Sequence, residues 1–544
     1  MNEPDETTFL VTRDGTRLAA DVYLPRQASR VPAVLARTPY GKASNAVWFP
    51  AIGRLFADNG IAFVAQDVRG HYDSGGELAP FIETADGWDT LDWITRQRWS
   101  NGDTAVFGES YVGFTAIEAA ASGHPSVRAA ALRNTGTDIR GDWLRHLGVL
   151  RLEFVLRWSL AAWSGRDNLA PEIDFSVRPL ERIAPALAPL IGAGRVPAVL
   201  GEWSRGTGPA KVWPDEAPWP ALIDRLRVPV HLTTGWWDLF VRGAVRDWSR
   251  ISVRPGVESR FVSEPTDHAG HDWGDGPTPD PLADFDALAA RMPEVLASEV
   301  AFLRKHLLGV EDGRPATASW MLTHVGMQHT ASWPPPGTEI RTLNLVDGGQ
   351  ARRGPEGGGL SPRPDRVPVE ARWRNDPANL VPALEGEAVD GWFRRPDERR
   401  TQVRDDVLTF TTSAFREPLD LAGPVIANLV VRAPAVGGHV MAKLCDVYPE
   451  GEARRISDGA FLLSGGPEPV RAPVELGHTG YRLRPGHRLR LEVSSSAFPR
   501  YIAHPGTATD PWSAIATRPA DLALLTGPGG STLSLTVLPT TSEG

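Results

Sequence analysis

Ser110 has the neighbours that nucleophilic chemistry requires. It stands between Gly108 and Gly113, after the apolar run 104–107 and before an Ala-rich segment that ends at Gly123. This pattern predicts a strand, a sharp turn with the serine at its apex, and a helix. Small neighbours let strand and helix approach closely, and a helix N-terminus favours negative charge beside the serine. The pattern is typical of a serine nucleophile, although an ordinary strand-to-helix turn has the same local appearance.

Two residues further along the chain could activate this serine. A serine hydroxyl is a weak nucleophile at neutral pH and needs a general base, which in turn needs an orienting carboxylate. Asp238 and His268 each follow an expected strand, and the order Ser, Asp, His is that of one known class of triads. Asp238 could instead be a solvated loop carboxylate or a helix N-cap. His271, three residues later in the same loop, is the alternative base.

The oxyanion that forms in acyl transfer needs two hydrogen-bond donors. One expected donor is the backbone N–H of Tyr111, the residue after the serine. The second should come from the loop after an early strand, and that loop contains Tyr40 in a Pro-Tyr-Gly turn. A tyrosine in such a turn is more often a packing residue, so the residues alone leave its role open.

These side chains need a sheet that brings several strand ends together. Segments with strand and helix patterns alternate, after an expected hairpin at 8–23. The predicted strands are 32–37, 61–67, 104–107, 129–133, 228–235 and 259–264, and the predicted helices are 49–59, 83–97 and 292–308. This alternation predicts a parallel α/β sheet with its site at the carboxyl ends of the strands. Asp67 and Arg69, in the loop after one strand, are expected to form an ion pair.

The character of the sequence changes twice. Residues 141–225 are rich in tryptophan and proline and predict a helical cap, inserted into an α/β core formed by 1–140 and 226–318. From residue 319 to 544, short alternating segments separated by Gly and Pro predict a β-sandwich or jelly roll. The expected fold class is therefore α/β with an added all-β domain, which a chain of 544 residues can accommodate.

Composition argues against several classes of function. The net charge of −9 is modest and the Lys and Arg residues are scattered, so no nucleic-acid surface is expected. The chain has no apolar run of membrane-spanning length and no signal-peptide pattern, which favours a cytoplasmic location without membrane association. Cys445 is the only cysteine, which excludes an intramolecular disulfide and a Cys-based metal cluster. We expect no metal or other cofactor.

Six motifs together resemble the cocaine esterase-like family of α/β-hydrolases, which also covers Xaa-Pro dipeptidyl-peptidases and cephalosporin acylases. The motifs are Arg13-Asp-Gly, Arg37-Thr-Pro-Tyr40-Gly-Lys, Gln66-Asp-Val-Arg-Gly70, Gly108-Glu-Ser110-Tyr-Val-Gly113, Gly235-Trp-Trp-Asp238 and Pro265-Thr-Asp-His268. Segments 375–382 and 492–500 resemble the jelly-roll domain of that family. The resemblance implies an α/β-hydrolase core, a helical cap and a C-terminal jelly roll. It also implies Ser110 as nucleophile, Asp238 and His268 as its partners, and the Tyr40 hydroxyl with the Tyr111 N–H as the oxyanion hole.

The chain departs from the family pattern at two places near the expected site. Glu264-Pro-Thr266 stands where members often have Gly-Pro-Trp, which could reshape the pocket. Val112 stands where α-amino ester hydrolases have Glu, so recognition of a substrate ammonium by that route is doubtful.

The sequence thus predicts a serine hydrolase that cleaves a small-molecule ester, or an amide, through an acyl-enzyme intermediate. The alternatives are an Xaa-Pro dipeptidyl-peptidase, an acylase, and an acyltransferase or tailoring hydrolase of a biosynthetic pathway. From a different class, the chain could be a non-catalytic binding protein on a hydrolase fold. We also consider a homodimer. The residues expected to line the substrate pocket are Trp143, Trp158, Trp163, Trp237 and Phe240.

Overall fold

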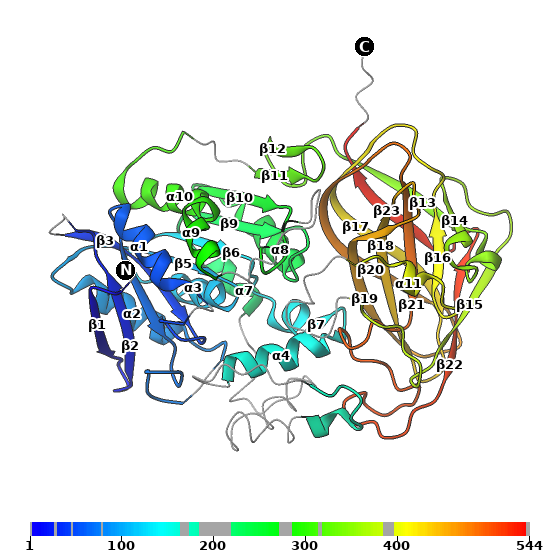
Figure 1. Ribbon diagram of the computed structural model, residues 1–544, viewed down its shortest axis with the longest axis horizontal. Helices are drawn as coiled ribbons and strands as arrows, with labels where there is room; N and C mark the ends of the chain where they lie inside the picture. The colour runs from blue at the N-terminus through cyan, green and yellow to red at the C-terminus, as the bar shows by residue number, and fades with distance from the viewer. Residues whose placement is uncertain are drawn as a thin grey trace, which may run out of the picture.

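The computed structural model describes residues 3–26, 30–44, 47–77, 80–163, 173–183, 219–270, 272, 285–313, 318–384 and 396–539. Figure 1 shows an N-terminal α/β domain, blue to green, beside a C-terminal β domain, yellow to red. Helix α4 (Leu152–Trp163) and the short strand β7 (Arg145–His146) lie between them. The two fold types predicted from the sequence are both present.

One sheet organises the N-terminal domain. Its strands, in spatial order, are β1 (Glu6–Val11), β2 (Arg17–Tyr23), β4 (Ala62–Asp67), β3 (Val31–Thr38), β5 (Ser100–Glu109), β6 (Val127–Arg133), β9 (Val230–Gly235), β10 (Ser259–Glu264), β11 (Ala318–Leu322) and β12 (Gly326–Thr330). Neighbours from β4 to β11 run parallel, whereas β1, β2 and β12 pair in an antiparallel manner. Every residue of β3 and β4 is buried, as strands covered on both faces require.

Helices cover both faces of this sheet. They are α1 (Phe49–Asp58), α2 (Thr84–Thr95), α3 (Tyr111–Ala121), α8 (Val241–Ile251), α9 (Phe285–Val295) and α10 (Ala297–Leu308). Phe56 of α1 and Phe302 of α10 belong to the core cluster on one face, and Leu91 of α2 and Phe114 of α3 to the cluster on the other. The single helix predicted at 292–308 is instead two helices. The two helices meet at Leu296, whose backbone leaves helical values with φ −101° and ψ 13°.

The described chain between β6 and β9 is only partly helical. It contains a π-helix at Ile139–Trp143, β7, β8 (Val149–Leu150), α4, a 3-10 turn at Leu180–Arg182 and α7 (Trp219–Arg225). These elements lie within or next to the range predicted as a helical cap, whose boundaries stay a prediction.

The C-terminal domain is built from antiparallel strands around an apolar core. Its strands are β13 (Glu339–Val346), β14 (Gly358–Ser361), β15 (Val369–Asn375), β16 (Leu408–Thr411), β17 (Leu419–Arg432), β18 (Gly438–Val447), β19 (Ala453–Leu463), β20 (Val470–Leu483), β21 (Arg488–Ser494), β22 (Ala520–Thr526) and β23 (Thr532–Val537), with the short helix α11 (Arg399–Gln402) and one parallel pairing, between β14 and β16. Strands β11 and β12 lie at and after the predicted domain boundary at residue 319 and continue the first sheet. The alternating pattern of that hairpin resembles the strands that follow, so the sequence alone did not separate them.

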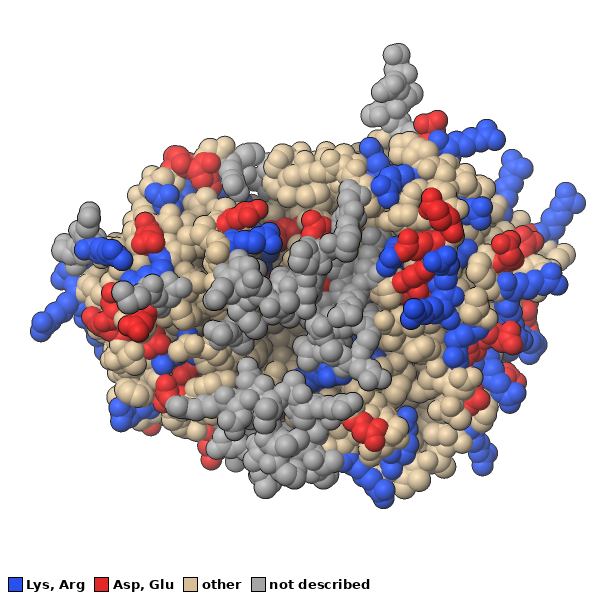
Figure 2. All heavy atoms as spheres, viewed as in Figure 1, with Lys and Arg blue, Asp and Glu red and all other residues tan. Residues whose placement is uncertain are grey.

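The surface carries charges of both signs. On the face in Figure 2, acidic and basic side chains are interspersed over the described residues, most densely on the C-terminal domain. Within the ranges that the structure describes, no helix combines the length and the apolar character needed to cross a membrane.

Candidate active site

Ser110 lies at the turn between β5 and α3. Its backbone has φ 58° and ψ −127°, a region that residues with a side chain rarely adopt. The flanking glycines are explained by close approach of strand and helix. A Cβ on Gly108 would lie 2.3 Å from the carbonyl group of Val112, and one on Gly113 would lie 2.8 Å from Thr135 Cγ2. Only a residue without a side chain fits at these two positions. The tight turn that results places Ser110 at the end of the strand.

Three of the residues singled out in the sequence meet at the ends of three parallel strands. His268 Nε2 lies 3.0 Å from Ser110 Oγ, and His268 Nδ1 lies 2.5 Å from Asp238 Oδ2. Asp238 follows β9 and His268 follows β10, which are neighbours in the sheet. The imidazole is thus held between a hydroxyl that can lose a proton and a carboxylate that can stabilise the imidazolium. The alternative base, His271, lies outside the described residues.

Burial and charge act in opposite directions on this histidine. Burial disfavours the imidazolium, but the carboxylate of Asp238 and its hydrogen bond outweigh burial and raise the pKa of His268. The Asp238 side chain is fully buried, and its second oxygen accepts a hydrogen bond from the Phe240 backbone N–H at 2.6 Å. The carboxylate is therefore fixed in orientation. Elsewhere in the described ranges, no group of three or more His, Cys, Asp or Glu residues is arranged to hold a metal ion.

The Tyr40 hydroxyl lies beside the serine, on the loop after β3. It takes part in hydrogen bonds with the Ser110 side chain and with the indole N–H of Trp158, the latter at 2.7 Å. An indole N–H can only donate, so the tyrosine oxygen accepts there and keeps its own proton for another partner. Burial raises the pKa of Tyr40, which keeps the hydroxyl protonated. Tyr111 is the first residue of α3, where backbone N–H groups lack an intrahelical acceptor.

Aromatic rings pack around the histidine and the turn. Phe240 meets the His268 ring edge-on with 5.3 Å between centroids, and Trp143 stacks on Phe240 at 4.2 Å. Trp158 lies 5.6 Å from the Tyr111 ring. Three of the predicted pocket residues therefore form one aromatic cluster at the site.

Trp237 is another of the predicted pocket residues. The indole N–H of Trp237 donates to the Arg455 carbonyl at 3.2 Å, and its ring packs against Tyr481, so it lies against the C-terminal domain. Trp163 is the last residue of α4, and its side chain lies outside what the structure describes.

Comparisons with known proteins match most of the chain. The family model described as X-Pro dipeptidyl-peptidase (S15 family) matches residues 14–270, and the one described as X-Pro dipeptidyl-peptidase C-terminal non-catalytic domain matches residues 309–529. Cocaine esterase from Rhodococcus sp. (strain MB1 Bresler) is 31% identical over 543 residues, which cover 91% of each chain. The chain belongs to this S15-type family of α/β-hydrolases.

Two solved structures show that the fold of this hydrolase is shared along nearly its full length. An aminopeptidase from the marine sediment archaeon Thaumarchaeota archaeon superposes with a TM-score of 0.81 at 20% identity, covering 99% of this chain and 97% of the other. An α-amino acid ester hydrolase gives a TM-score of 0.80 at 22% identity, with coverages of 98% and 96%. Each match therefore extends over both the α/β domain and the β domain of this chain.

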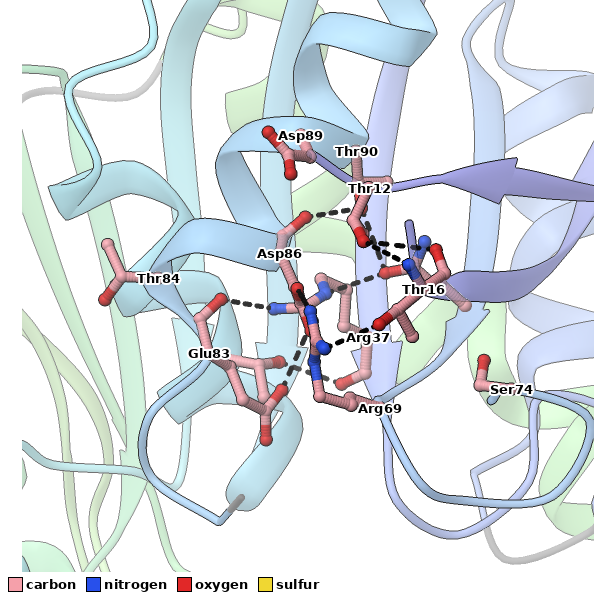
Figure 3. A network of polar contacts seen from close by, with 12 residues as sticks. Thr12, Thr16, Arg37, Arg69, Ser74, Glu83, Thr84, Asp86, Asp89 and Thr90 are labelled. Carbon is pink, nitrogen blue, oxygen red and sulfur yellow. Dashed lines mark hydrogen bonds and ion pairs between the residues drawn. The ribbon is translucent and has the colours of Figure 1, made fainter. Parts of the chain in front are cut away.

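A buried polar network that the sequence analysis missed supports the turn of this S15-type hydrolase. The Tyr111 hydroxyl donates to Glu83 Oε1 at 2.5 Å, and Glu83 Oε2 lies 3.4 Å from an Arg37 nitrogen. Figure 3 shows Arg37 and Arg69 converging on Glu83 and Asp86 from separate segments. Burial raises the pKa of Glu83. In the sequence, Glu83 has the appearance of an ordinary residue at a helix start, so no local signal identified it.

The ion pair predicted between Asp67 and Arg69 is wrong. Arg69 pairs with Asp86 and with Asp14, whose carboxylate lies 2.7 Å away. Asp67 instead accepts backbone N–H groups, including that of Lys42 at 2.6 Å. The chain turns after Asp67, so two residues near in sequence face different parts of the loop.

Glu264 is one of the departures from the family pattern, and its role is visible here. Its carboxylate pairs with Arg133 at the end of β6, and Arg133 also lies 3.1 Å from Glu299 of α10. The next residue, Asn134, donates to Glu109 beside the serine at 2.7 Å. Glu264 thus ties the end of β10, from which the histidine loop departs, to the strand beside the serine.

Proposed function

We propose that this S15-type hydrolase is a serine esterase with Ser110, His268 and Asp238 as its catalytic triad. The observation that carries the proposal is the imidazole of His268, which contacts the serine oxygen through one nitrogen and the buried carboxylate through the other. The strained serine backbone supports the same assignment, because such conformations cluster at functional positions.

The proposed reaction has two halves that use the same groups. Ser110 Oγ attacks the ester carbonyl while His268 Nε2 accepts its proton, and the imidazolium then protonates the leaving alcohol. The Tyr40 hydroxyl and the Tyr111 N–H donate to the oxyanion. Water then attacks the acyl-enzyme with His268 again as base, which releases the acid and restores the serine.

The surroundings of the serine favour an apolar or aromatic acyl group. Phe240, Trp143 and Trp158 give the region around His268 an aromatic character. The name of the 31% identical relative, cocaine esterase, supports an ester substrate. Val112 is buried at the position where a carboxylate would serve amine recognition in the α-amino ester hydrolases. We therefore rank esters above peptides.

Cleavage of an amide is the second candidate, supported by the family model named for X-Pro dipeptidyl-peptidases. Rates on a nitrophenyl ester and a nitroanilide with the same acyl group separate the two candidates. We expect the ratio of the ester rate to the anilide rate to be much larger with the enzyme than in uncatalysed hydrolysis. If an X-Pro nitroanilide with a free N-terminus is cleaved as fast as the ester, the result would favour peptidase activity.

The first experiment is stopped-flow hydrolysis of nitrophenyl acetate, butyrate and benzoate. We expect the wild-type protein to release a burst of one nitrophenolate per active site, as acyl-enzyme accumulation requires. Ser110→Ala should lose the burst and at least ~10⁴ in kcat. Ser122→Ala, at the far end of the same helix, is the matched control and should retain both. A burst that survives in Ser110→Ala would refute the assignment of the nucleophile.

A further inference from the structure

A small cavity lies at the junction of the two domains, beside Asp238. Its volume is about 40 Å³, which exceeds the roughly 10–15 Å³ that one water molecule needs. The N-terminal domain contributes the loop after β9, the start of α8, and β7 with the residue before α4. The C-terminal domain contributes β19, one residue of β20 and the segment after β21. The charged residues of the lining are Asp238, Asp458, Arg151, Arg242, Arg455 and Arg500. Arginines therefore outnumber acids around a space too small for a substrate.

Arg151 is the group in this lining that needs a counter-charge. Its side chain is 8% exposed, and no carboxylate of the described residues forms an ion pair with it. One terminal nitrogen donates to the Leu239 carbonyl at 2.8 Å, whereas Nε is buried without a hydrogen-bond partner. Burial, together with Arg242 and Arg500, lowers the pKa of Arg151. An arginine nevertheless stays charged in proteins, and an unpaired buried charge is costly.

Asp238 pairs with His268, and the other acids near the cavity already pair with other arginines. Asp458 lies 3.1 Å from Arg500 and 3.6 Å from Arg455. Asp142 lies 2.9 Å from Arg242, which also approaches a second carboxylate. Neither acid forms an ion pair with the buried guanidinium of Arg151, so among the described residues this positive charge has no direct counter-ion.

Neutral donors complete the lining. The Ser457 hydroxyl is buried without a hydrogen-bond partner in the described structure. His146 interacts through its ring nitrogens with the Glu475 carbonyl at 2.9 Å and with the Tyr501 hydroxyl at 3.2 Å. Burial lowers the pKa of His146 well below its usual range, so it adds no positive charge. Two unsatisfied donors, the Arg151 Nε–H and the Ser457 hydroxyl, therefore line the same space.

We propose that this cavity binds a small monovalent anion, which is chloride in ordinary buffers, between the Arg151 guanidinium and the Ser457 hydroxyl. The ion supplies the missing counter-charge and accepts from the two donors that lack partners. Arg151 also holds the carbonyl of Leu239, the residue after Asp238. The ion therefore lies at a contact that connects the C-terminal domain to the loop of the proposed catalytic acid. Because the site exists only in the folded protein, binding stabilises it by mass action.

Thermal unfolding in different sodium salts at equal ionic strength tests the proposal. Chloride and bromide should raise the unfolding midpoint over gluconate, which is too large to enter, by about 1–2 °C with saturation. Arg151→Met should remove this difference, and Ser457→Ala should reduce it. Arg128→Met is the matched control, because Arg128 is 51% exposed and pairs with Asp103 far from the cavity. Equal midpoints of the wild-type protein in chloride and gluconate would overturn the proposal.

Diffraction from wild-type crystals soaked in bromide locates the ion without any variant, so the test holds even if Arg151→Met does not fold. The expected result is an anomalous bromide peak within hydrogen-bonding distance of Arg151 and Ser457. Water density alone in the cavity, or bromide only elsewhere on the protein, would show that the charge is accommodated in another way.

Discussion

Two His–Asp pairs of similar geometry lie in the two domains of this hydrolase. In the N-terminal domain, His268 Nδ1 lies 2.5 Å from Asp238. In the C-terminal domain, His487 Nδ1 lies 2.8 Å from Asp446. Both carboxylates have fully buried side chains. The contact between imidazole and carboxylate is alike in the two pairs, so this contact alone does not show that their roles differ.

What differs is the environment of each pair. His268 presents its second nitrogen to Ser110 at the end of a parallel sheet. His487 packs its ring on Tyr448 with 4.6 Å between centroids, and the other oxygen of Asp446 accepts the Tyr481 hydroxyl at 2.9 Å. A buried His–Asp pair is therefore a structural unit that either domain can hold. The strained turn places a serine hydroxyl beside only the first of these two pairs.

Removal of each histidine in turn tests whether the two pairs have different roles, and it should give the largest effect. His268→Ala should lower kcat by at least ~10⁴, because the serine loses its base. His487→Ala should keep turnover close to wild type but lower the free energy of unfolding by about 1–3 kcal/mol, because Asp446 would stay buried without its partner. Steady-state kinetics and chemical denaturation measure the two effects. Loss of turnover in a well-folded His487→Ala protein would place the second pair in the chemistry.

The next largest effect concerns Tyr40, the proposed oxyanion donor beside the first pair. Tyr40→Phe should reduce kcat by about 10²–10³, as the loss of one donor does. Tyr448→Phe, beside the second pair, is the matched control and should leave kcat unchanged. If Tyr40→Phe has a near-normal kcat, the tyrosine is a packing residue after all.

A smaller effect on kcat is expected at Trp158, which contacts Tyr40 and not the serine. Trp158 donates to the Tyr40 oxygen and so leaves the tyrosine proton for the serine side. Trp158→Phe keeps an aromatic ring but removes this hydrogen bond, and should lower kcat by about 3–10-fold. Trp320→Phe is the control, because its indole donates to Thr330 in the β11–β12 hairpin and not to Tyr40. A change in KM alone would mean that Trp158 acts only as an apolar wall.

The parts of the site that could be predicted from the sequence are those determined locally. The glycines around Ser110 are required by the contact of one strand with the next helix, which the pattern itself encodes. The nearness of Asp238 and His268 follows from a general rule, that parallel strand ends gather at one edge.

Side-chain directions after a turn could not be predicted in the same way. Trp237 and Phe240 are three residues apart, yet the first contacts the C-terminal domain and the second contacts His268. The partner of Arg69 is likewise decided by where α2 places Asp86, seventeen positions along the chain. Contacts of this kind depend on how whole helices and strands pack, so the local sequence pattern does not predict them.

The smallest expected effect is a displacement of the pH profile, and it applies to the first pair alone. Asp238, and to a lesser extent Glu109, raise the pKa of His268 against the effect of burial. The base must be neutral to accept the serine proton, so kcat/KM should fall as the pH drops below this raised pKa, with its acid limb above the ordinary histidine value of about 6.5. Glu109→Gln removes one of the favourable charges and should move that limb to lower pH by a fraction of a unit, whereas His487→Ala should leave it in place. An acid limb below the ordinary value in the wild-type protein would mean that burial, rather than the carboxylate, controls the charge of the proposed base.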